Sequence, residues 1–324
     1  MQPLAYSPCG ALDSVDHIVV DGAGQPSTVL TLSHWPHSGT PAELRADLSA
    51  EIAFRYLDQP AFHVDAQAVT NNHFDQDGLV SVYALTDPDD ALRRREQLVD
   101  VARAGDFGKF RERSSAAAGF TIAQLGAELD TDPYPEILER LGEILDHPDR
   151  YAAYWESEDA HLRASEDAIA SGAVTIEELP EVDLAVVQVP EDLPALTAHR
   201  FSRTTSQVVH HMAVHNATDR LRILYVQGRR YELQYLYETW IQLASFRPMP
   251  RVDLAGLVEQ LDELESWGGR WSFSGAGDIA PTLQLRDADE SSITPERFRS
   301  LLVDALRTGA PAWNPYGGGD DDTA

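Results

Sequence analysis

The 324-residue sequence has few cysteines, few basic residues and no long apolar run, and each scarcity excludes some classes of protein. It has one cysteine, Cys9, so no disulfide can form within the chain, and we expect a reducing, cytoplasmic environment. It has no run of 18 apolar residues, so we expect no membrane-spanning helix and no membrane partner. The first residues lack the basic and apolar regions of a secretory signal, and we expect none.

Positive charge is also scarce. The chain has 25 lysine and arginine residues against 53 acidic ones, a net charge of −28, and Lys109 is its only lysine. Binding along a nucleic-acid backbone needs clustered positive charge, so no broad nucleic-acid contact is expected. A small anionic substrate is compatible with this composition, because a metal ion or a few local arginines can override the global field. Nothing in the sequence indicates the oligomeric state.

One stretch carries the chemistry that the composition leaves open. After an apolar run at Ala66–Thr70, ligand-type residues stand at alternate positions: His73, Asp75 and Asp77. In an extended chain these three side chains would project from one face. One imidazole and two carboxylates at the end of a strand suit a divalent metal such as Mn²⁺, Zn²⁺ or Fe²⁺. The spacing therefore predicts a metal site.

The residues after this motif predict a turn into a helix. Gly78 would allow a sharp turn, taking a positive φ if needed. The apolar segment Leu79–Leu85 would then begin a short helix whose N-terminal amides favour anions. Two other interpretations compete. A calcium loop would need an oxygen ligand where His73 stands and a glutamate shortly after Gly78, and this sequence has neither. An ordinary turn would use the aspartates as helix caps.

A second histidine is predicted at a strand end. The residues from Thr28 to Trp35 are typical of a strand, which Pro36 stops, and His34 lies near its end. A helix opened by Thr40-Pro41 follows, so residues 28–78 predict a strand–helix–strand crossover with parallel strands. Both strands would then end at one edge of the sheet, where ligand sites of α/β folds lie. Otherwise His34 is a turn residue before a proline.

Further along, an acid and a histidine pair are additional metal-ligand candidates. Asp106 follows a predicted helix that Gly105 would end, and it is either a ligand or a loop residue. His210 and His211 lie in a cluster with His215. In a helix, His211 and His215 would share a face and could chelate one metal, whereas in a strand they would lie about 13 Å apart. The alternative is a partly buried histidine pair at the start of a β region.

The order of patterns predicts an α/β protein in several parts. We expect a parallel-sheet lobe at 1–108, a helical connector at 109–180, a smaller α/β lobe at 181–312 and a disordered acidic tail at 313–324. The helices expected in and around the connector are Phe110–Leu129, Tyr134–Leu145 and Tyr151–Ser171. In the second lobe we expect a strand at Asp183–Val189, a hairpin around Gln227-Gly228-Arg229, a helix at Val252–Leu264, strands at Trp271–Ser274 and Pro281–Leu285, and a helix at Phe298–Leu306.

The pattern His73-x-Asp75-x-Asp77-Gly78 resembles the first motif of the DHH phosphoesterases, in which the histidine and both aspartates hold a pair of Mn²⁺ ions. Asp106 would match the lone aspartate of that family's second motif, and His210-His211 resembles its Asp-His-His, although Val209 stands in place of the aspartate. The second half is similar to the family's accessory domain. Its double glycine, Gly268-Gly269, is followed by Arg270 instead of the family's further glycine and histidine. The chain as a whole also resembles a family of actinobacterial proteins that carries no assigned function.

This resemblance implies a metal-dependent hydrolase of a small phosphoester with one or two Mn²⁺-type ions. His73 and Asp77 would be catalytic, and Arg270 would contribute a cation to the substrate. The competing hypothesis is a non-catalytic binding or regulatory protein that retains part of such a site. The missing aspartate before His210 and the missing histidine after Gly269 favour that alternative.

Overall fold

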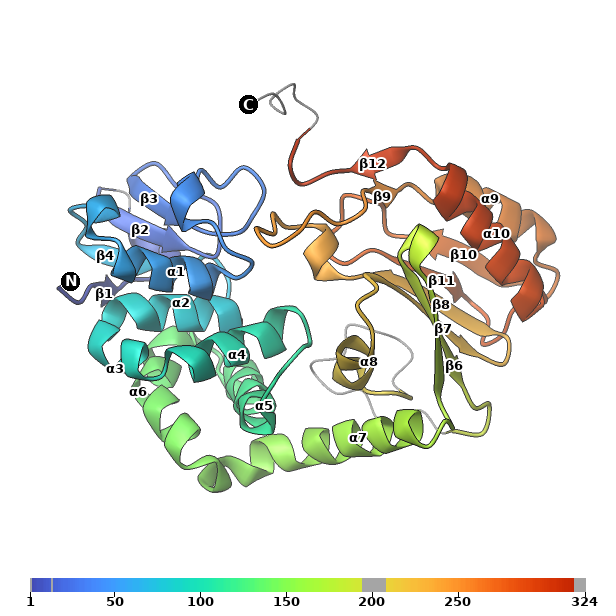
Figure 1. The fold of residues 1–324 in the computed structure, drawn as a ribbon, viewed down its shortest axis with the longest axis horizontal. Coiled ribbons are helices and arrows are strands. Elements are labelled where there is room, and N and C mark those ends of the chain that lie inside the picture. The colour runs from blue at the N-terminus through green and yellow to red at the C-terminus, as the bar shows by residue number, and fades with distance from the viewer. Residues whose placement is uncertain (1, 13, 194–207, 318–324) are drawn as a thin grey trace. The chain divides into compact units, whose positions relative to one another are not determined.

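The computed structural model describes residues 2–12, 14–193 and 208–317, and the chain divides into two compact units (Figure 1). Unit 1 comprises residues 1–160 and 242–247, and unit 2 comprises 161–241 and 248–324. A short segment from the second half of the sequence therefore belongs to the first unit. Each unit has its own sheet and its own helices, so each is described by itself.

Unit 1 contains a parallel sheet of four short strands: β1 (Ala5–Tyr6), β2 (His17–Val20), β3 (Thr28–Leu32) and β4 (Ala68–Thr70). Their order is β1-β4-β2-β3, and each pairing between neighbours is parallel. Every residue of β2 and β4 is buried, as expected for parallel strands covered on both faces. The predicted α/β class with a parallel sheet in the first lobe is confirmed.

The described part of unit 1 also contains the helices α1 (Ser49–Asp58), α2 (Gln76–Thr86), α3 (Pro88–Arg93), α4 (Arg95–Asp106), α5 (Arg113–Glu128) and α6 (Tyr134–Asp146). Helix α2 contacts α1, α3, α4, α5 and α6. It is buried from Gln76 to Leu85, which fits its nearly continuous apolar sequence. Helix α2 is therefore the central helix of the unit.

Two predicted helix starts were wrong. The helix expected at Thr40-Pro41 begins at Ser49, because the Thr40 hydroxyl instead bonds the carbonyls of Thr31 and Ser33. The helix expected from Leu79 begins three residues earlier, at Gln76, because the Asp75 side chain accepts a hydrogen bond from the Gly78 amide and caps it. The sequence between His73 and Asp77 is therefore not an extended strand.

The predicted helical connector also differs from the structure. The three helices expected there do form, but α5 packs against α2 and α4, and α6 packs against α2 and α5, so both belong to unit 1. Helix α7 (Ala152–Ala170) contains the boundary between the units, which falls after Ala160. The residues that follow it form β5 (Thr175–Leu179), a strand of the second sheet that was not predicted.

Unit 2 is built on a six-stranded sheet with the order β10-β11-β8-β7-β6-β5. The β6–β7 pair is parallel and the other pairs are antiparallel, and the predicted hairpin is present as β7 and β8 around Gly228. The strands after β5 are β6 (Leu184–Val189), β7 (Arg222–Gln227), β8 (Arg230–Tyr235), β10 (Arg270–Phe273) and β11 (Thr282–Arg286). The helices are α8 (His211–Ala217), α9 (Ala255–Leu264) and α10 (Pro295–Thr308).

The main core of unit 2 lies between one face of this sheet and helices α9 and α10. Tyr231, Trp271 and Phe298 stack there, with Phe298 4.5 Å from the Tyr231 ring and 5.0 Å from that of Trp271. A two-stranded ladder, β9 (Arg251–Val252) with β12 (Pro311–Trp313), lies beside it. The tail expected at 313–324 therefore begins with an ordered strand end, and residues 318–324 lie outside the described residues.

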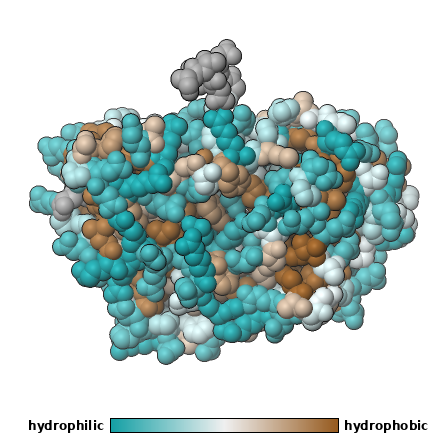
Figure 2. Space-filling model, viewed as in Figure 1, coloured by the Kyte–Doolittle hydropathy of each residue, from teal (hydrophilic) through white to brown (hydrophobic). Residues whose placement is uncertain are grey.

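Short 3₁₀ turns complete the connections, at Cys9–Ala11, Ala42–Leu44, Pro60–Phe62, Pro148–Tyr151, Pro180–Val182 and Tyr237–Thr239. The face in Figure 2 is mostly hydrophilic, in keeping with the excess of acidic residues. Large exposed hydrophobic side chains such as Leu92, Met249 and Trp267 are few. Among the described residues, no helix has both the length and the apolar composition that crossing a membrane requires.

Candidate metal centre

Three of the parallel strands of unit 1 are followed closely by a residue that can bind a metal. Asp21 directly follows β2, His34 stands two residues after β3, and His73 stands three residues after β4. Because these strands are parallel neighbours, their carboxyl ends meet at one edge of the sheet. The sequence predicted this shared edge for His34 and His73, and the structure adds Asp21 between them.

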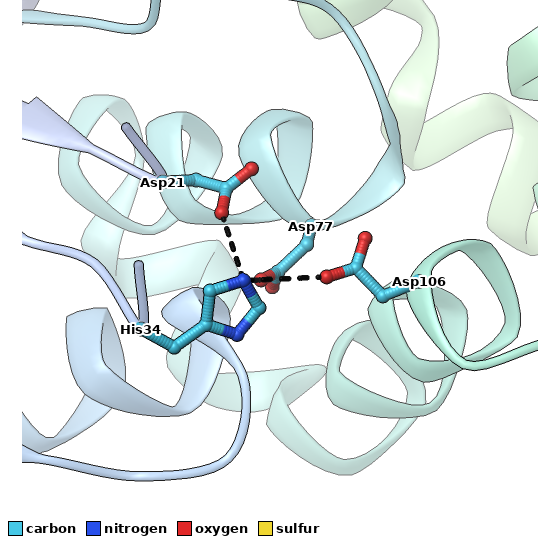
Figure 3. A group of neighbouring side chains, drawn as sticks. All are labelled: Asp21, His34, Asp77 and Asp106. Atoms are coloured by element: carbon cyan, nitrogen blue, oxygen red, sulfur yellow. Dashed lines mark ion pairs between the residues drawn. The ribbon is translucent and has the colours of Figure 1, made fainter. Parts of the chain in front are cut away.

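Four side chains form a buried group at this edge: Asp21, His34, Asp77 and Asp106. Each offers one ligand atom within 4.8 Å of the others. Nε2 of His34 lies 3.3 Å from Asp21 Oδ1, 3.5 Å from Asp106 Oδ2 and 4.0 Å from Asp77 Oδ2. Figure 3 shows the His34 ring directed toward the three carboxylates, which come from a strand end and two helices.

A second group shares Asp21 with the first. It contains Asp21, His73 and Asp75. Nε2 of His73 lies 3.2 Å from Asp21 Oδ2 and 2.8 Å from Asp75 Oδ2. The two oxygens of Asp21 therefore face different imidazoles, Oδ1 toward His34 and Oδ2 toward His73. One carboxylate joins the two groups into a single cluster.

Both imidazoles are oriented by their other ring nitrogen. His34 Nδ1 lies 2.8 Å from the carbonyl oxygen of Asp47, and His73 Nδ1 lies 2.9 Å from Asn72 Oδ1. A carbonyl oxygen only accepts hydrogen bonds, so each Nδ1 carries a proton and Nε2 is the atom that can take a cation. Histidines that bind metals almost always have such a second partner.

A segment from the second half of the sequence supports His34. The backbone amide of Gln242 donates to the His34 carbonyl over 2.9 Å. The Asp47 carboxylate accepts hydrogen bonds from the amides of Ala244 and Ser245 and from the Ser245 hydroxyl. Asp47 thus connects the 242–247 segment to the imidazole, since its own carbonyl holds His34 Nδ1.

The aspartates also cap helices, as the competing interpretation predicted. Asp77 Oδ2 and Oδ1 accept hydrogen bonds from the amides of Ser49 and Ala50, at 2.7 and 2.8 Å, at the start of α1. Asp75 Oδ1 caps α2, while its Oδ2 faces His73. The two interpretations are therefore compatible, because a carboxylate has more lone pairs than a cap uses. Capping fixes the orientation of each carboxylate toward the imidazoles.

Burial and mutual attraction shift the pKa values of the cluster. Burial alone would lower the pKa of His34, but hydrogen bonding and attraction to Asp21 outweigh it and raise the pKa to about 9. Burial is likewise outweighed at His73, where Asp21 and Asp75 raise the pKa to about 10. Burial raises the pKa of Asp77 to about 8, and the charge of Asp21 adds to this effect. Protons therefore occupy the cluster at neutral pH unless another cation replaces them.

The pKa of Asp21 is shifted in the opposite direction, so this residue stays charged. Burial by itself would raise the pKa of Asp21, but the nearby imidazoles of His34 and His73 stabilise its charged form and hold the pKa far below its usual range. The Ser49 hydroxyl also donates to Asp21 Oδ1 over 2.8 Å. Asp21 is therefore the charged centre to which both imidazoles are attracted.

Glycines allow the close packing that brings the acids together. A Cβ on Gly105 would lie 2.5 Å from Gln76 Oε1 and 2.6 Å from Gln76 Cβ, so α4 and α2 approach closely only because this residue is glycine. The next residue on each helix is a cluster member, Asp106 on α4 and Asp77 on α2. Gly105 was expected to stop α4, but the helix continues through Asp106.

Gly78 has a different role from the one predicted. It lies inside α2 and is not among the residues with positive φ. A Cβ there would lie 2.1 Å from Asn71 Nδ2 and 2.7 Å from the Tyr134 hydroxyl oxygen. The glycine is required by close packing around the motif instead of by a turn.

Sequence reasoning missed Asp21. The residue has φ of +45°, a conformation that aspartate tolerates better than most residues. A signal was present, because an apolar strand at 17–20 is followed at once by Asp-Gly, the same kind of strand end as the one at His73. Gly22 packs closely on Asn72, where a Cβ would lie 2.7 Å from the side-chain oxygen.

The cluster is reached from one side. The side chains of His73 and Asp75 are 33% and 27% exposed, whereas those of Asp21, His34 and Asp77 are 1% exposed or less. Trp35 stacks on His73 with ring centroids 5.4 Å apart. A ligand from solvent would therefore meet His73 and Asp75 first.

The remaining predicted site residues belong to unit 2. His211 and His215 lie on α8, as the helical interpretation required, and the Nδ1 of His210 accepts a hydrogen bond from the Met212 amide. In the described part of the chain, neither His210 nor His211 joins a group of three potential ligand atoms within 4.8 Å. Arg270 is 74% exposed and lies 3.7 Å from Asp262. These residues are therefore not part of the cluster in unit 1.

Comparison with known proteins identifies a family to which no function is assigned. The chain belongs to a family described as "Family of unknown function (DUF6687)", whose model matches residues 2–317. No curated protein matches the sequence. The family thus covers both units and assigns no activity to the cluster, so the function is argued from its geometry.

Proposed function

We propose that the Asp/His cluster of unit 1 holds one or two divalent metal ions of the Mn²⁺ type, and that the protein is a metal-dependent hydrolase of a small phosphoester. The candidate ligands are Asp21, His34, Asp77 and Asp106 for the buried group, and Asp21, His73 and Asp75 for the more open one. Carboxylate and imidazole ligands together suit Mn²⁺ and Zn²⁺ better than Ca²⁺.

The observation that carries this proposal is the position of Asp21 between two oriented imidazoles. Its Oδ2 is buried and, among the described residues, has no hydrogen bond of good geometry, although His73 Nε2 lies 3.2 Å away. Its Oδ1 lies 3.3 Å from His34 Nε2. A cation on each side would satisfy both oxygens and both imidazoles. The residues therefore fit a site of one or two ions.

A bound metal of this type would lower the pKa of a water molecule and neutralise charge on phosphoryl oxygens. The protein's own contribution is to hold the ligands in place and to admit substrate at one side. Buried Asp21, His34 and Asp77 are fixed by α1 and by the strand ends. His73 lies at the open side, and when only the buried group holds an ion it can keep a proton at Nε2, where Asp75 orients it.

The placement of four residues supports the DHH-like part of this proposal. His73, Asp75 and Asp77 of the first motif, and Asp106 proposed for the second, all belong to the two groups. Two features differ from the expectation: Asp106 ends a helix instead of following a strand, and Asp21 and His34 lie outside the motifs. A DHH-like phosphoesterase with an altered set of ligands is the activity we propose.

A binding or regulatory protein with a degenerate site is the second candidate. It is favoured by Val209 in place of an aspartate and by Arg270 where the DHH family has no arginine. It is also favoured by the two backbone amides that already occupy Asp77. This candidate predicts metal binding without hydrolysis, whereas the first predicts both.

Two measurements separate these candidates. Elemental analysis of the purified full-length protein, followed by calorimetric titration with Mn²⁺, tests metal binding. A screen of bis-p-nitrophenyl phosphate, short oligonucleotides and polyphosphate, with and without Mn²⁺, tests hydrolysis. Metal-dependent turnover that Asp77→Asn or Asp21→Asn abolishes would support the enzyme.

The matched control is Asp100→Asn. Asp100 is also buried, and it also accepts backbone amides, from Arg111 and Glu112, but it belongs to neither group. Activity unchanged in Asp77→Asn would reject the mechanism. Binding of Mn²⁺ without turnover of any of these substrates would favour the regulatory candidate.

A further inference from the structure

The six-stranded sheet of unit 2 has two different faces. On one face, Leu224, Leu233 and Leu283 are buried in the core with α9 and α10. Because side chains alternate along a strand, their neighbours point to the opposite face. There a row of polar side chains crosses three strands: Gln284 pairs with Glu232, and Glu232 pairs with Tyr225. The face opposite the main core is thus polar where it crosses β7, β8 and β11.

These polar side chains are buried. Tyr225 is 3% exposed, Glu232 4% and Gln284 8%. Gln227, the next residue on this face of β7, is buried to a similar extent, and its amide nitrogen donates to the carbonyls of Pro190 and Leu193. A row of buried acid, phenol and amide groups is unusual for a sheet face that only supports a core.

A cavity of about 380 Å³ lies over this row. Its polar lining includes Tyr225, Gln227, Glu232 and Gln284, and its apolar lining includes Val189 and Val208. A few convergent polar groups with apolar walls are typical of small-molecule sites, and this volume is at the lower end of their range. All of its lining residues belong to unit 2.

The Tyr225 hydroxyl is the observation that points to a ligand. Its oxygen is buried and, across the described residues, has no hydrogen-bond partner. Other buried tyrosines of this sheet do have one: Tyr235 donates to the Val252 carbonyl and Tyr231 to the Ile293 carbonyl. A buried hydroxyl without a partner is costly, so a group that bonds it from within the cavity would be stabilising.

The charge of the lining defines the kind of ligand. Among the described lining residues, Glu232 and Asp289 are acidic and Arg230 is the basic one, and Arg230 lies 3.9 Å from Glu290, outside the lining. An anionic ligand would be repelled, whereas N–H groups would find a carboxylate, a phenol oxygen and amide oxygens as acceptors. The apolar walls suit the faces of a flat ring.

We propose that this cavity binds a small, uncharged, flat heterocycle that carries N–H groups, the chemistry shared by free nucleobases and nucleosides. Tyr225 bonds the ring edge, Glu232 and Gln284 accept from its N–H groups, and Val189 and Val208 contact its faces. The site belongs to unit 2 and the metal centre to unit 1, and the existence of this site does not depend on the proposed hydrolase activity.

The test is a calorimetric titration of the full-length protein with the four common nucleobases and their nucleosides, repeated with the nucleoside monophosphates. A chelator in the buffer prevents binding through the metal centre. We expect at least one nucleobase or nucleoside to bind, and its monophosphate to bind at least tenfold more weakly. Tyr225→Phe should weaken binding about tenfold without lowering the melting temperature, since the lost oxygen has no partner among the described residues.

Tyr235→Phe is the matched control. It also removes a buried tyrosine oxygen from the same sheet, but that oxygen bonds Val252 and Tyr235 does not line the cavity. We expect it to lower the melting temperature and leave binding unchanged. Ala288→Phe, which fills the cavity from its partly exposed wall, should abolish binding while the fold is kept. The proposal is overturned if no base or nucleoside binds at millimolar concentration, if Tyr225→Phe or Ala288→Phe binds as the wild type does, or if monophosphates bind as tightly as nucleosides.

Discussion

Each unit of the molecule has a region of closely spaced histidines, and the two regions differ in what surrounds the rings. In unit 1, His34 and His73 are far apart in sequence but both direct Nε2 at Asp21. In unit 2, the His210 ring stacks on that of His211 with centroids 4.8 Å apart, and it meets the His161 ring edge-on at 5.2 Å. Nearness in sequence therefore predicted the histidine region of unit 2, and the topology of the sheet created the group of histidines and carboxylates in unit 1.

A cation site therefore depends on the carboxylates as much as on the imidazoles. The unit 1 region combines two imidazoles with four carboxylates, and every ligand atom has a neighbour of the other kind.

Removing the shared carboxylate should have the largest effect. Asp21→Asn keeps the shape of the side chain but removes the charge that both imidazoles face. We expect the affinity for Mn²⁺ to fall about 100-fold or more, because both groups lose a ligand. Calorimetric titration measures this loss. The prediction fails if the variant binds Mn²⁺ as tightly as Asp100→Asn, the buried control outside both groups.

Replacing one histidine in each unit tests the contrast directly. His34→Gln should lower Mn²⁺ affinity about 10- to 100-fold. His210→Gln should leave it unchanged but cost about 0.5–2 kcal/mol of unfolding free energy, because His210 caps α8 through the Met212 amide. Titration and urea unfolding of both variants give the two readouts. Equal losses of metal affinity in both would remove the distinction between the regions.

The close contact between α4 and α2 should matter for both stability and metal binding. In Gly105→Ala the new Cβ would clash with Gln76, so we expect a loss of about 1–3 kcal/mol and weaker Mn²⁺ binding as Asp106 moves away. Gly142→Ala on α6 is the control, since a Cβ there has no heavy atom within 4 Å. It should stabilise the protein by about 0.5–1 kcal/mol. A stable Gly105→Ala variant with full affinity would show that this packing does not position Asp106.

A carboxylate of unit 2 that accepts hydrogen bonds from a neighbouring loop should give the smallest effect, seen as a dependence of stability on pH. Burial would raise the pKa of Glu265, but hydrogen bonds from Ser291 and Ser292 outweigh it and lower the pKa to about 2. Its contribution to stability is therefore complete above the unfolded-state pKa of about 4.3 and is lost as the pH falls toward 2.

Thermal melts of Glu265→Gln at pH 7, 4 and 2.5 check this sign. The variant should melt below the wild type at pH 7, and the difference should shrink as the pH falls. A difference that is constant or grows in acid would contradict the assignment. Glu265 belongs to neither group of potential metal ligands, so adding Mn²⁺ should not change its effect.

Much of the architecture could be predicted because it depends on local patterns. The strands that precede His34 and His73, the hairpin around Gly228 and the helices α5 to α7 follow from periodicity, turn residues and proline. The shared edge of the strands followed from the parallel crossover. Local patterns do not, however, specify which other strand lies between β3 and β4.

That missing strand is the reason why Asp21 was not predicted. β2 lies between β3 and β4, and its pairing with β4, as of Ile18 with Val69, spans a long sequence distance that no local signal encodes. The extended interpretation of His73 to Asp77 was wrong for a related reason. The amides at the start of α1 bond Asp77, so its side chain joins His34 instead of His73 and Asp75. In both cases tertiary contacts decided the outcome.

The proposed function requires that the two groups joined by Asp21 hold metal. The most direct test is a crystal structure of the protein with Mn²⁺, using anomalous scattering at the manganese edge to locate the ions. We predict one or two peaks within about 2.0–2.3 Å of the Asp21 oxygens, with His34 Nε2 or His73 Nε2 completing the coordination. Crystals that show no peak at Asp21, or manganese bound only at the histidines of unit 2, would contradict it.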